Sequence, residues 1–100
     1  MKNEDDQFNI LRSISRNPGA SQRNISKSLG LSLGKVNYCL QALKQKGLIK
    51  ISNFRKSEDK LKYAYVITPR GFTEKAKLTV KFMKRKMQEY DELKKESDNS

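Results

Sequence analysis

The side chains best suited to recognising a ligand lie close together in one short stretch of the chain. They are Lys35, Asn37, Tyr38 and Gln41. An Asn or Gln amide can donate one hydrogen bond and accept another on the edge of adenine, and Lys can reach guanine or a phosphate. The hydroxyl of Ser32 can cap a helix whose first amides bind phosphate. The alternative is that these polar groups are only solvated.

The distribution of charge favours an anionic partner. The chain has 22 Lys and Arg against 11 Asp and Glu, for a formal net charge of +11. No acidic residue occurs from Gln7 to Ser57, and this stretch contains the cations Arg12, Arg16, Arg23, Lys27, Lys35, Lys44, Lys46, Lys50, Arg55 and Lys56. A solvated surface normally mixes both signs. The commonest partner of such a segment is a phosphate backbone, and an anionic membrane surface is the alternative.

Enzyme chemistry has little support in the sequence. The chain has no His and a single Cys, so it offers neither a His-based triad nor a zinc ligand set, and it has no Gly-rich phosphate loop. We therefore expect no catalytic residue, no metal and no cofactor. We expect Cys39 to be a small apolar filler on the buried side of a helix rather than a redox sensor.

The location expected from the sequence is the cytoplasm. Cys39 cannot form an internal disulfide, which suits a reducing compartment. No apolar run is long enough to span a bilayer, and the first residues (MKNEDDQF) lack the apolar stretch of a signal peptide.

Three helices precede residue 47 in the predicted order of elements. The first contains Phe8, Leu11 and Ile14 at helical spacing and stops at Asn17-Pro18-Gly19. Ser21 is the expected N-cap of the second helix, and Gly30 its expected end. Ser32 caps the third helix, which ends at Gly47.

The second and third helices are separated only by Gly30-Leu31-Ser32. Their apolar positions, which must face one small core, are Ile25, Leu29, Val36, Leu40 and Leu43. This spacing is typical of a helix-turn-helix, in which the second helix enters the major groove. An ordinary helical hairpin remains the alternative from periodicity alone.

A hairpin and a long helix complete the chain. Residues 48–53 (LIKISN) and 61–68 (LKYAYVIT) are expected to be strands, with a polar loop from Arg55 to Lys60 between them. Thr68-Pro69 opens the last helix, which should run from about Arg70 to about Glu96. The fold class is therefore α+β, mostly helical, with residues 1–68 as the main domain, 69–96 as a long helix and 97–100 as a frayed tail.

The stretch from Ser21 to Gly71 resembles the winged helix-turn-helix domain of MarR-type transcriptional regulators. The residues that carry the resemblance are Gly47-Leu48-Ile49 and Ile67-Thr68-Pro69-Arg70-Gly71. Residues 31–40 (LSLGKVNYCL), 75–80 (KAKLTV) and 84–87 (KRKM) are similar to a short subgroup associated with exopolysaccharide gene clusters. The resemblance implies a sequence-specific, homodimeric regulator that binds double-stranded DNA. Only one short helix precedes the helix-turn-helix, so we expect no small-molecule effector.

The expected contacts with DNA come from three elements. At the start of the second helix, where the family contacts phosphate, they are Gln22 and Arg23. In the third helix they are Ser32, Lys35, Asn37, Tyr38 and Gln41, and in the wing they are the basic residues Arg55, Lys56 and Lys60. A basic wing tip can reach the minor groove.

The last helix is expected to form the dimer interface. Its apolar positions are Phe72, Ala76, Val80, Met83, Met87 and Tyr90. A core of this size covers only part of such a helix, and a two-fold related copy is the simplest cover for the rest. The alternative for this helix is that its second half is partly solvated. The alternative for the function of the chain is a winged helix that docks on another protein through the wing or through this helix.

Overall fold

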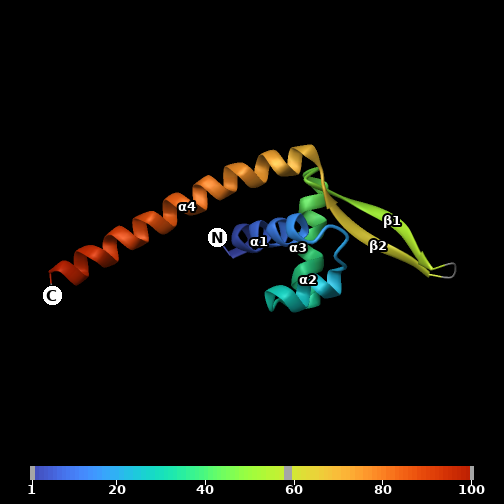
Figure 1. Cartoon of the computed structure of the whole chain (residues 1–100), viewed down its shortest axis with the longest axis horizontal. Coiled ribbons are helices and arrows are strands. Elements are labelled where there is room, and N and C mark those ends of the chain that lie inside the picture. The colour runs from blue at the N-terminus through green and yellow to red at the C-terminus, as the bar shows by residue number, and fades with distance from the viewer. Residues whose placement is uncertain (1, 58–59, 100) are drawn as a thin grey trace.

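The computed structural model describes residues 2–57 and 60–99, and it describes side chains for residues 4–51 and 65–99. In chain order the elements are α1 (Lys2–Arg16), α2 (Gln22–Leu29), α3 (Leu33–Gln45), β1 (Ile49–Ser57), β2 (Lys60–Ile67) and α4 (Pro69–Asp98). The first three helices form the body of the molecule, and the β1–β2 hairpin and α4 extend from it in opposite directions (Figure 1). The principal extents of 65 × 26 × 20 Å reflect this elongated shape.

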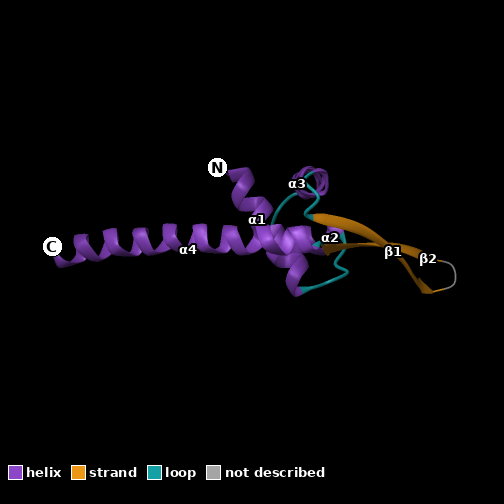
Figure 2. Cartoon of the chain, turned by 90° about the horizontal axis from the view of Figure 1, so that it is seen from above, coloured by secondary structure: helices purple, strands orange, loops and turns teal. Residues whose placement is uncertain are grey.

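The core lies where α1, α2 and α3 meet. Its fully buried side chains are Ile10, Leu11, Ile14, Ile25, Val36, Cys39, Leu40 and Leu43. The predicted apolar faces of the three helices are thereby confirmed, and Cys39 is buried as expected. Seen from above, α3 crosses the direction of α4 steeply, while the hairpin continues roughly along it (Figure 2).

The turn between α2 and α3 is fixed by the caps that the sequence predicts. Ser21 and Ser32 accept hydrogen bonds from the backbone amides three residues ahead, each at 3.1 Å. Gly30 ends α2 at φ 67°, a left-handed conformation that residues with a Cβ rarely adopt. The Ser26 hydroxyl donates to the Leu31 carbonyl at 2.5 Å, which ties the turn back onto α2.

The hairpin is longer than the sequence predicts. β1 and β2 pair antiparallel from Ile49 opposite Ile67 to Ser57 opposite Lys60. The prediction of a polar loop from Arg55 to Lys60 is therefore wrong, because Arg55 and Lys56 belong to β1 and Lys60 begins β2. Backbone pairing satisfies the amide and carbonyl groups whatever the side chains are, so polar residues can extend an exposed hairpin.

The junction between the hairpin and α4 is held by one threonine. Thr68 caps α4 by accepting a hydrogen bond from the Gly71 amide at 3.0 Å, and its hydroxyl donates to the Gly47 carbonyl at 2.6 Å. A Cβ at Gly71 would overlap the carbonyl oxygen of Leu48 and the side chain of Ile67. Glycine at this position allows the start of α4 to lie directly against the start of the hairpin.

Helix α4 begins at Pro69 as predicted but continues to Asp98, two residues past the expected end. Its 30 residues correspond to about 45 Å at 1.5 Å per residue. The part of α4 up to Arg85 meets the body: Leu78 packs against the core, Phe82 stacks on Phe8 with ring centroids 4.6 Å apart, and Arg85 contacts Asp5. The second half projects beyond α1 (Figure 1).

Candidate nucleic-acid interface

The exposed face of α3 carries the polar residues that the sequence singles out. Asn37 and Gln41 are exposed, and Tyr38 is 59% exposed. The opposite face of the helix is buried in the core through Val36 and Leu40. A rigidly packed helix therefore presents an amide, a phenol and a second amide together, in an arrangement suited to base edges.

Lys35 does not belong to this group of exposed side chains. Its Nζ lies 3.2 Å from Oδ2 of Asp6, and the lysine is only half-exposed. Asp6 comes from α1, so Lys35 links the first turn of α3 to the first helix. The sequence interpretation of Lys35 as a free cation on the DNA side missed this partner, because two residues 29 positions apart give no local signal.

Gln22 and Ser32 support α3 from its N-terminal side. The Gln22 side chain donates to the carbonyl of Leu33 at 3.1 Å, so it joins the start of α2 to the start of α3. The Ser32 hydroxyl is used by the cap, and Arg23 is exposed beside Gln22. These residues frame the N-terminus of α3, where exposed amides and a helix dipole favour an anion.

Sequence reasoning passed over Leu33 and Gly34 in the first turn of α3. Leu33 is 44% exposed, although it is a large apolar residue. Gly34 has no neighbouring atom within 4 Å of the place that a Cβ would take. An exposed apolar side chain next to an uncrowded glycine marks a place where another molecule can approach the backbone closely. The exposure of Leu33 and the open space at Gly34 are visible only in the structure.

The basic residues predicted for the wing lie outside the residues whose side chains are described. They are Arg55, Lys56 and Lys60. The backbone places Arg55 opposite Leu61 and Ser57 opposite Lys60, at the end of the hairpin farthest from the helices (Figure 1).

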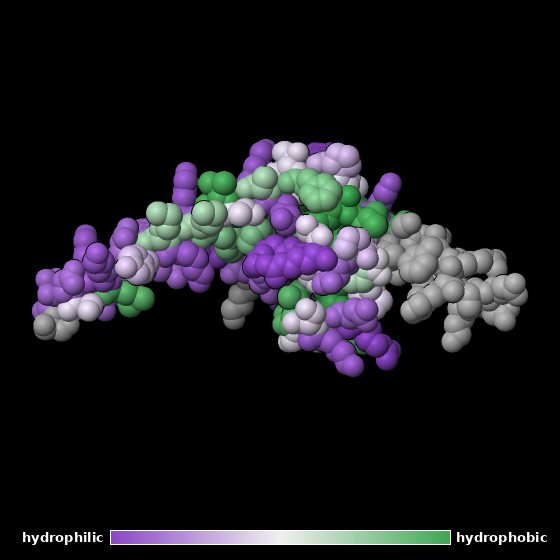
Figure 3. Space-filling view, viewed as in Figure 1, coloured by the Kyte–Doolittle hydropathy of each residue, from purple (hydrophilic) through white to green (hydrophobic). Residues whose placement is uncertain are grey.

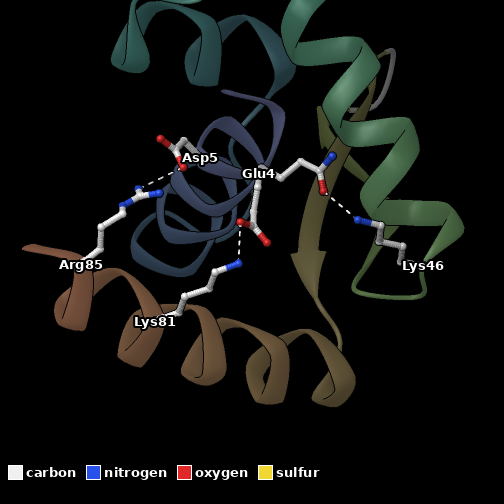
Figure 4. Close-up of polar contacts among 6 residues, drawn as sticks. Glu4, Asp5, Lys46, Lys81 and Arg85 are labelled. Atoms are coloured by element: carbon white, nitrogen blue, oxygen red, sulfur yellow. Dashed lines mark hydrogen bonds and ion pairs between the residues drawn. The ribbon is translucent and has the colours of Figure 1, made fainter. Parts of the chain in front are cut away.

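The acidic start of α1 contacts two other helices. Glu4 accepts a hydrogen bond from Lys81 at 2.8 Å, and Asp5 accepts one from Arg85 at 3.2 Å (Figure 4). Lys46, the residue that follows α3, donates to Gln7 of α1 at 3.0 Å. The Lys81 contact holds the pKa of Glu4 below its usual value. Residues 81–86 (KFMKRK) include four basic residues, and α1 engages two of them, Lys81 and Arg85. The sequence pattern did not reveal this long-range pairing.

Cys39 has an environment that suppresses thiol chemistry. Burial raises the pKa of its thiol above the usual value, and the negative charge of Asp6 acts in the same direction. Across residues 2–57 and 60–99, no group of three or more Cys, Asp and Glu side chains could hold a metal ion. Within those same ranges no helix is both long and apolar enough to cross a bilayer.

These elements form a recognisable arrangement. Residues 7–50 match a family model described as winged helix-turn-helix DNA-binding, and this match covers α1 from Gln7 onward, α2, α3 and the first residues of β1. The β1–β2 hairpin follows directly as the wing. The chain has a winged helix-turn-helix fold.

Several solved structures have a similar fold. PcaV of Streptomyces coelicolor is 19% identical with a TM-score of 0.70, over 78% of this chain and 54% of its own. MarR of Staphylococcus aureus is 25% identical with a TM-score of 0.60, over 81% and 54% of the two chains. FabT of Streptococcus pneumoniae, solved in complex with DNA, is 22% identical with a TM-score of 0.63, over 83% and 56%.

The chain spans about half the length of these solved proteins. No significant match was found among proteins of curated function. At these identities the comparisons establish the fold, and the function must be argued from the residues of the winged helix-turn-helix itself.

Proposed function

We propose that this chain is a transcriptional regulator of the MarR type that binds double-stranded DNA sequence-specifically as a homodimer in the cytoplasm. The observation that carries the proposal is the exposed face of α3, where Asn37, Tyr38 and Gln41 stand on a helix whose other face is locked in the core. Bidentate contacts between such amides and adenine discriminate between base pairs.

The electrostatics of the body support a phosphate partner. The segment from Gln7 to Ser57, which contains α2, α3 and β1, has no acidic residue. The carboxylates of α1 that lie nearest to it are engaged by Lys35, Lys81 and Arg85. These carboxylates, of Glu4, Asp5 and Asp6, are therefore neutralised by cations of the same chain, and they do not oppose the approach of a polyanion to the side of the molecule that carries the start of α3.

The proposed role of each element follows the geometry. Asn37, Tyr38 and Gln41 read bases in the major groove, while Arg23 and the N-terminus of α3 bind phosphate. The wing, with Arg55, Lys56 and Lys60, adds affinity from the backbone or minor groove. In this proposal Gln22, Ser32 and Lys35 position α3, with Lys35 reaching DNA only if it leaves Asp6. The chain acts without catalysis, cofactor or small-molecule effector.

The target genes proposed from the sequence are those of exopolysaccharide synthesis. The support is the similarity of residues 31–40, 75–80 and 84–87 to the subgroup associated with such clusters.

Selection of binding sites from random duplex DNA tests the proposal as a whole. It should return a pseudo-palindrome with half-sites about one helical turn apart, as expected for a two-fold dimer. Failure to enrich any sequence would contradict a specific regulator and favour a module that docks on protein.

The homodimer is proposed to form through α4. Its stripe of apolar side chains is exposed, and exposed stripes of that length are unusual on monomers. Met83→Glu should give a monomer by light scattering at micromolar concentration and should weaken DNA binding strongly, since each half-site is then bound alone. A substitution of the same kind at the exposed Gln88, Gln88→Glu, is the control and should leave the dimer intact. A monomeric unsubstituted chain would contradict the two-fold proposal.

A further inference from the structure

The apolar stripe of α4 has the spacing of a coiled-coil seam. Val80, Met83, Met87 and Tyr90 follow one another at alternating steps of three and four residues, and Ala76 precedes them at the same spacing. These four larger side chains are all more than half exposed, Met87 at 63%. Figure 3 shows green, apolar side chains gathered over the middle of α4 and mostly purple, hydrophilic ones toward its C-terminal end.

A different face of α4 is already packed against the body. Leu78 and Phe82 lie on that face, where Phe82 stacks on Phe8 of α1. Among the described residues, α1 therefore covers one side of the helix and leaves the stripe to solvent. An open groove of about 640 Å³ between α1 and α4, which Met83 and Met87 also line, is continuous with the stripe.

The charges of α4 are separated along its length. From residue 75 to 86 the helix carries six cations and no acid, namely Lys75, Lys77, Lys81, Lys84, Arg85 and Lys86. From residue 87 to 98 it carries five acids, Glu89, Asp91, Glu92, Glu96 and Asp98, against two lysines, Lys94 and Lys95. The same change from basic to acidic residues occurs along one flank of the stripe, where every seventh residue is charged: Lys77 and Lys84 are followed by Asp91 and Asp98.

We propose that α4 pairs with α4 of a second copy in the antiparallel orientation, with the two-fold axis near Arg85. This inference rests on the proposed homodimer and specifies its geometry. With this centre, antiparallel pairing sets the basic residues 75–81 of each helix beside residues 89–95 of the other, which carry three acids and two lysines. Lys84 then meets its own copy near the axis, whereas parallel pairing sets like charges side by side along the whole helix. Charges that flank the seam of a coiled coil select orientation in this way.

The apolar layers agree with a centre near Arg85. Met83 then faces Met87 of the partner subunit, and Val80 faces Tyr90 of the partner subunit, so every central layer is apolar. The flank places Lys77 beside Asp91 of the partner subunit, and the two-fold axis repeats this pair. The starts of the two α4 helices lie at opposite ends of the pair, while α1 of each copy extends toward the two-fold axis, where Asp5 contacts Arg85.

Disulfide cross-linking distinguishes the two orientations. We would prepare Val80→Cys and Tyr90→Cys separately, oxidise each alone and as an equimolar mixture, and analyse the products on non-reducing gels. In the antiparallel pair only the mixture should cross-link efficiently. In each single variant the two cysteines lie ten residues apart along the pair, about 15 Å. The unsubstituted chain is the control, because its only thiol, Cys39, is buried.

A charge exchange provides an independent measurement. Asp91→Lys should weaken dimerisation at least about tenfold, because two attractive pairs become repulsive. The double variant Lys77→Asp/Asp91→Lys should recover most of the loss, since it restores opposite charges across the antiparallel flank. Lys94→Gln is the matched control for a charge change in the same half of the helix and should alter dimerisation much less.

The outcomes separate this inference from the proposed function. Self-cross-linking of both single variants, with no hybrid preference, would show parallel helices and overturn the antiparallel orientation while leaving the DNA-binding proposal intact. A monomer in light scattering would overturn both the homodimer and its geometry. The predicted cross-links in a chain that binds no duplex specifically would support the antiparallel dimer and contradict the regulator.

Discussion

Asn37 and Gln41 are the residues on which the proposed sequence-specific function depends most directly. Both are exposed, lie one turn apart on α3, and carry amides that can both donate and accept. Lys35, which the sequence grouped with them, is directed to Asp6 instead. The difference arises because a helical pattern predicts the face of a residue but cannot predict which distant side chain a long, flexible lysine will meet.

The first prediction concerns Gln41. Gln41→Ala should relax the preference at one base pair of the selected site by about 1–3 kcal/mol, because a bidentate contact is lost. Affinities for the site and for each single-base variant, measured by fluorescence anisotropy, give this value. Gln45→Ala removes an equally exposed amide from the last residue of α3 and serves as the control. An unchanged preference profile in Gln41→Ala would exclude base recognition by this side chain.

Cys39 should be chemically inert in the folded protein. Its side chain is fully buried, and burial raises the pKa of the thiol, so little thiolate is present or accessible near neutral pH. Ellman's reagent should react with Cys39 only in denaturant, and mild peroxide should leave DNA binding unchanged. Rapid reaction of the native thiol would indicate a role in redox sensing.

At the scale of the elements, the sequence predicted most where a local signal determines the structure. Ser21, Gly30 and Ser32 fix the helix-turn-helix through caps that depend on neighbouring residues only, and all three act as predicted. The hairpin was underestimated, because its length depends on backbone pairing across the strands rather than on the polar side chains of residues 55–60. The contacts of α1 with α4 were missed because Glu4 and Lys81 are far apart in sequence.

The junction of hairpin and α4 should be intolerant of added volume. Gly71→Ala should destabilise the fold by about 3 kcal/mol, since the methyl group overlaps the backbone carbonyl of Leu48 and neither element can move independently. Gly34→Ala is the matched control: its methyl group meets open space, and the loss of glycine in a helix should raise stability by about 0.5–1 kcal/mol. Urea unfolding followed by circular dichroism measures both. Equal stability of the two variants would refute this account of the junction.

The wing should contribute affinity more than specificity. Arg55→Ala is expected to weaken binding to all duplexes by a similar factor, because a contact with phosphate carries no base information. Competition between the selected site and a shuffled duplex measures this directly. If Arg55→Ala changed the preferred sequence while Gln41→Ala did not, the roles assigned to the wing and to α3 would be reversed.

At the scale of the whole molecule, the elongated shape separates the helix proposed to read DNA from the helix proposed to form the dimer. The body places α3 between the hairpin and the projecting half of α4, and α4 carries an exposed apolar stripe away from the body (Figure 1). The acidic residues of α1 connect these parts, since Asp6 meets α3 while Glu4 and Asp5 meet α4.

The central claim is that this chain binds a specific duplex through phosphate contacts and base readout together. The most direct measurement is the affinity for the selected duplex and for a shuffled duplex of the same composition, each titrated from 50 to 200 mM salt. For about six phosphate contacts per dimer, both affinities should fall about a thousandfold over this range, and the selected duplex should remain the tighter ligand throughout. A response that is flat with salt, or equal affinity for the two duplexes, would contradict the account.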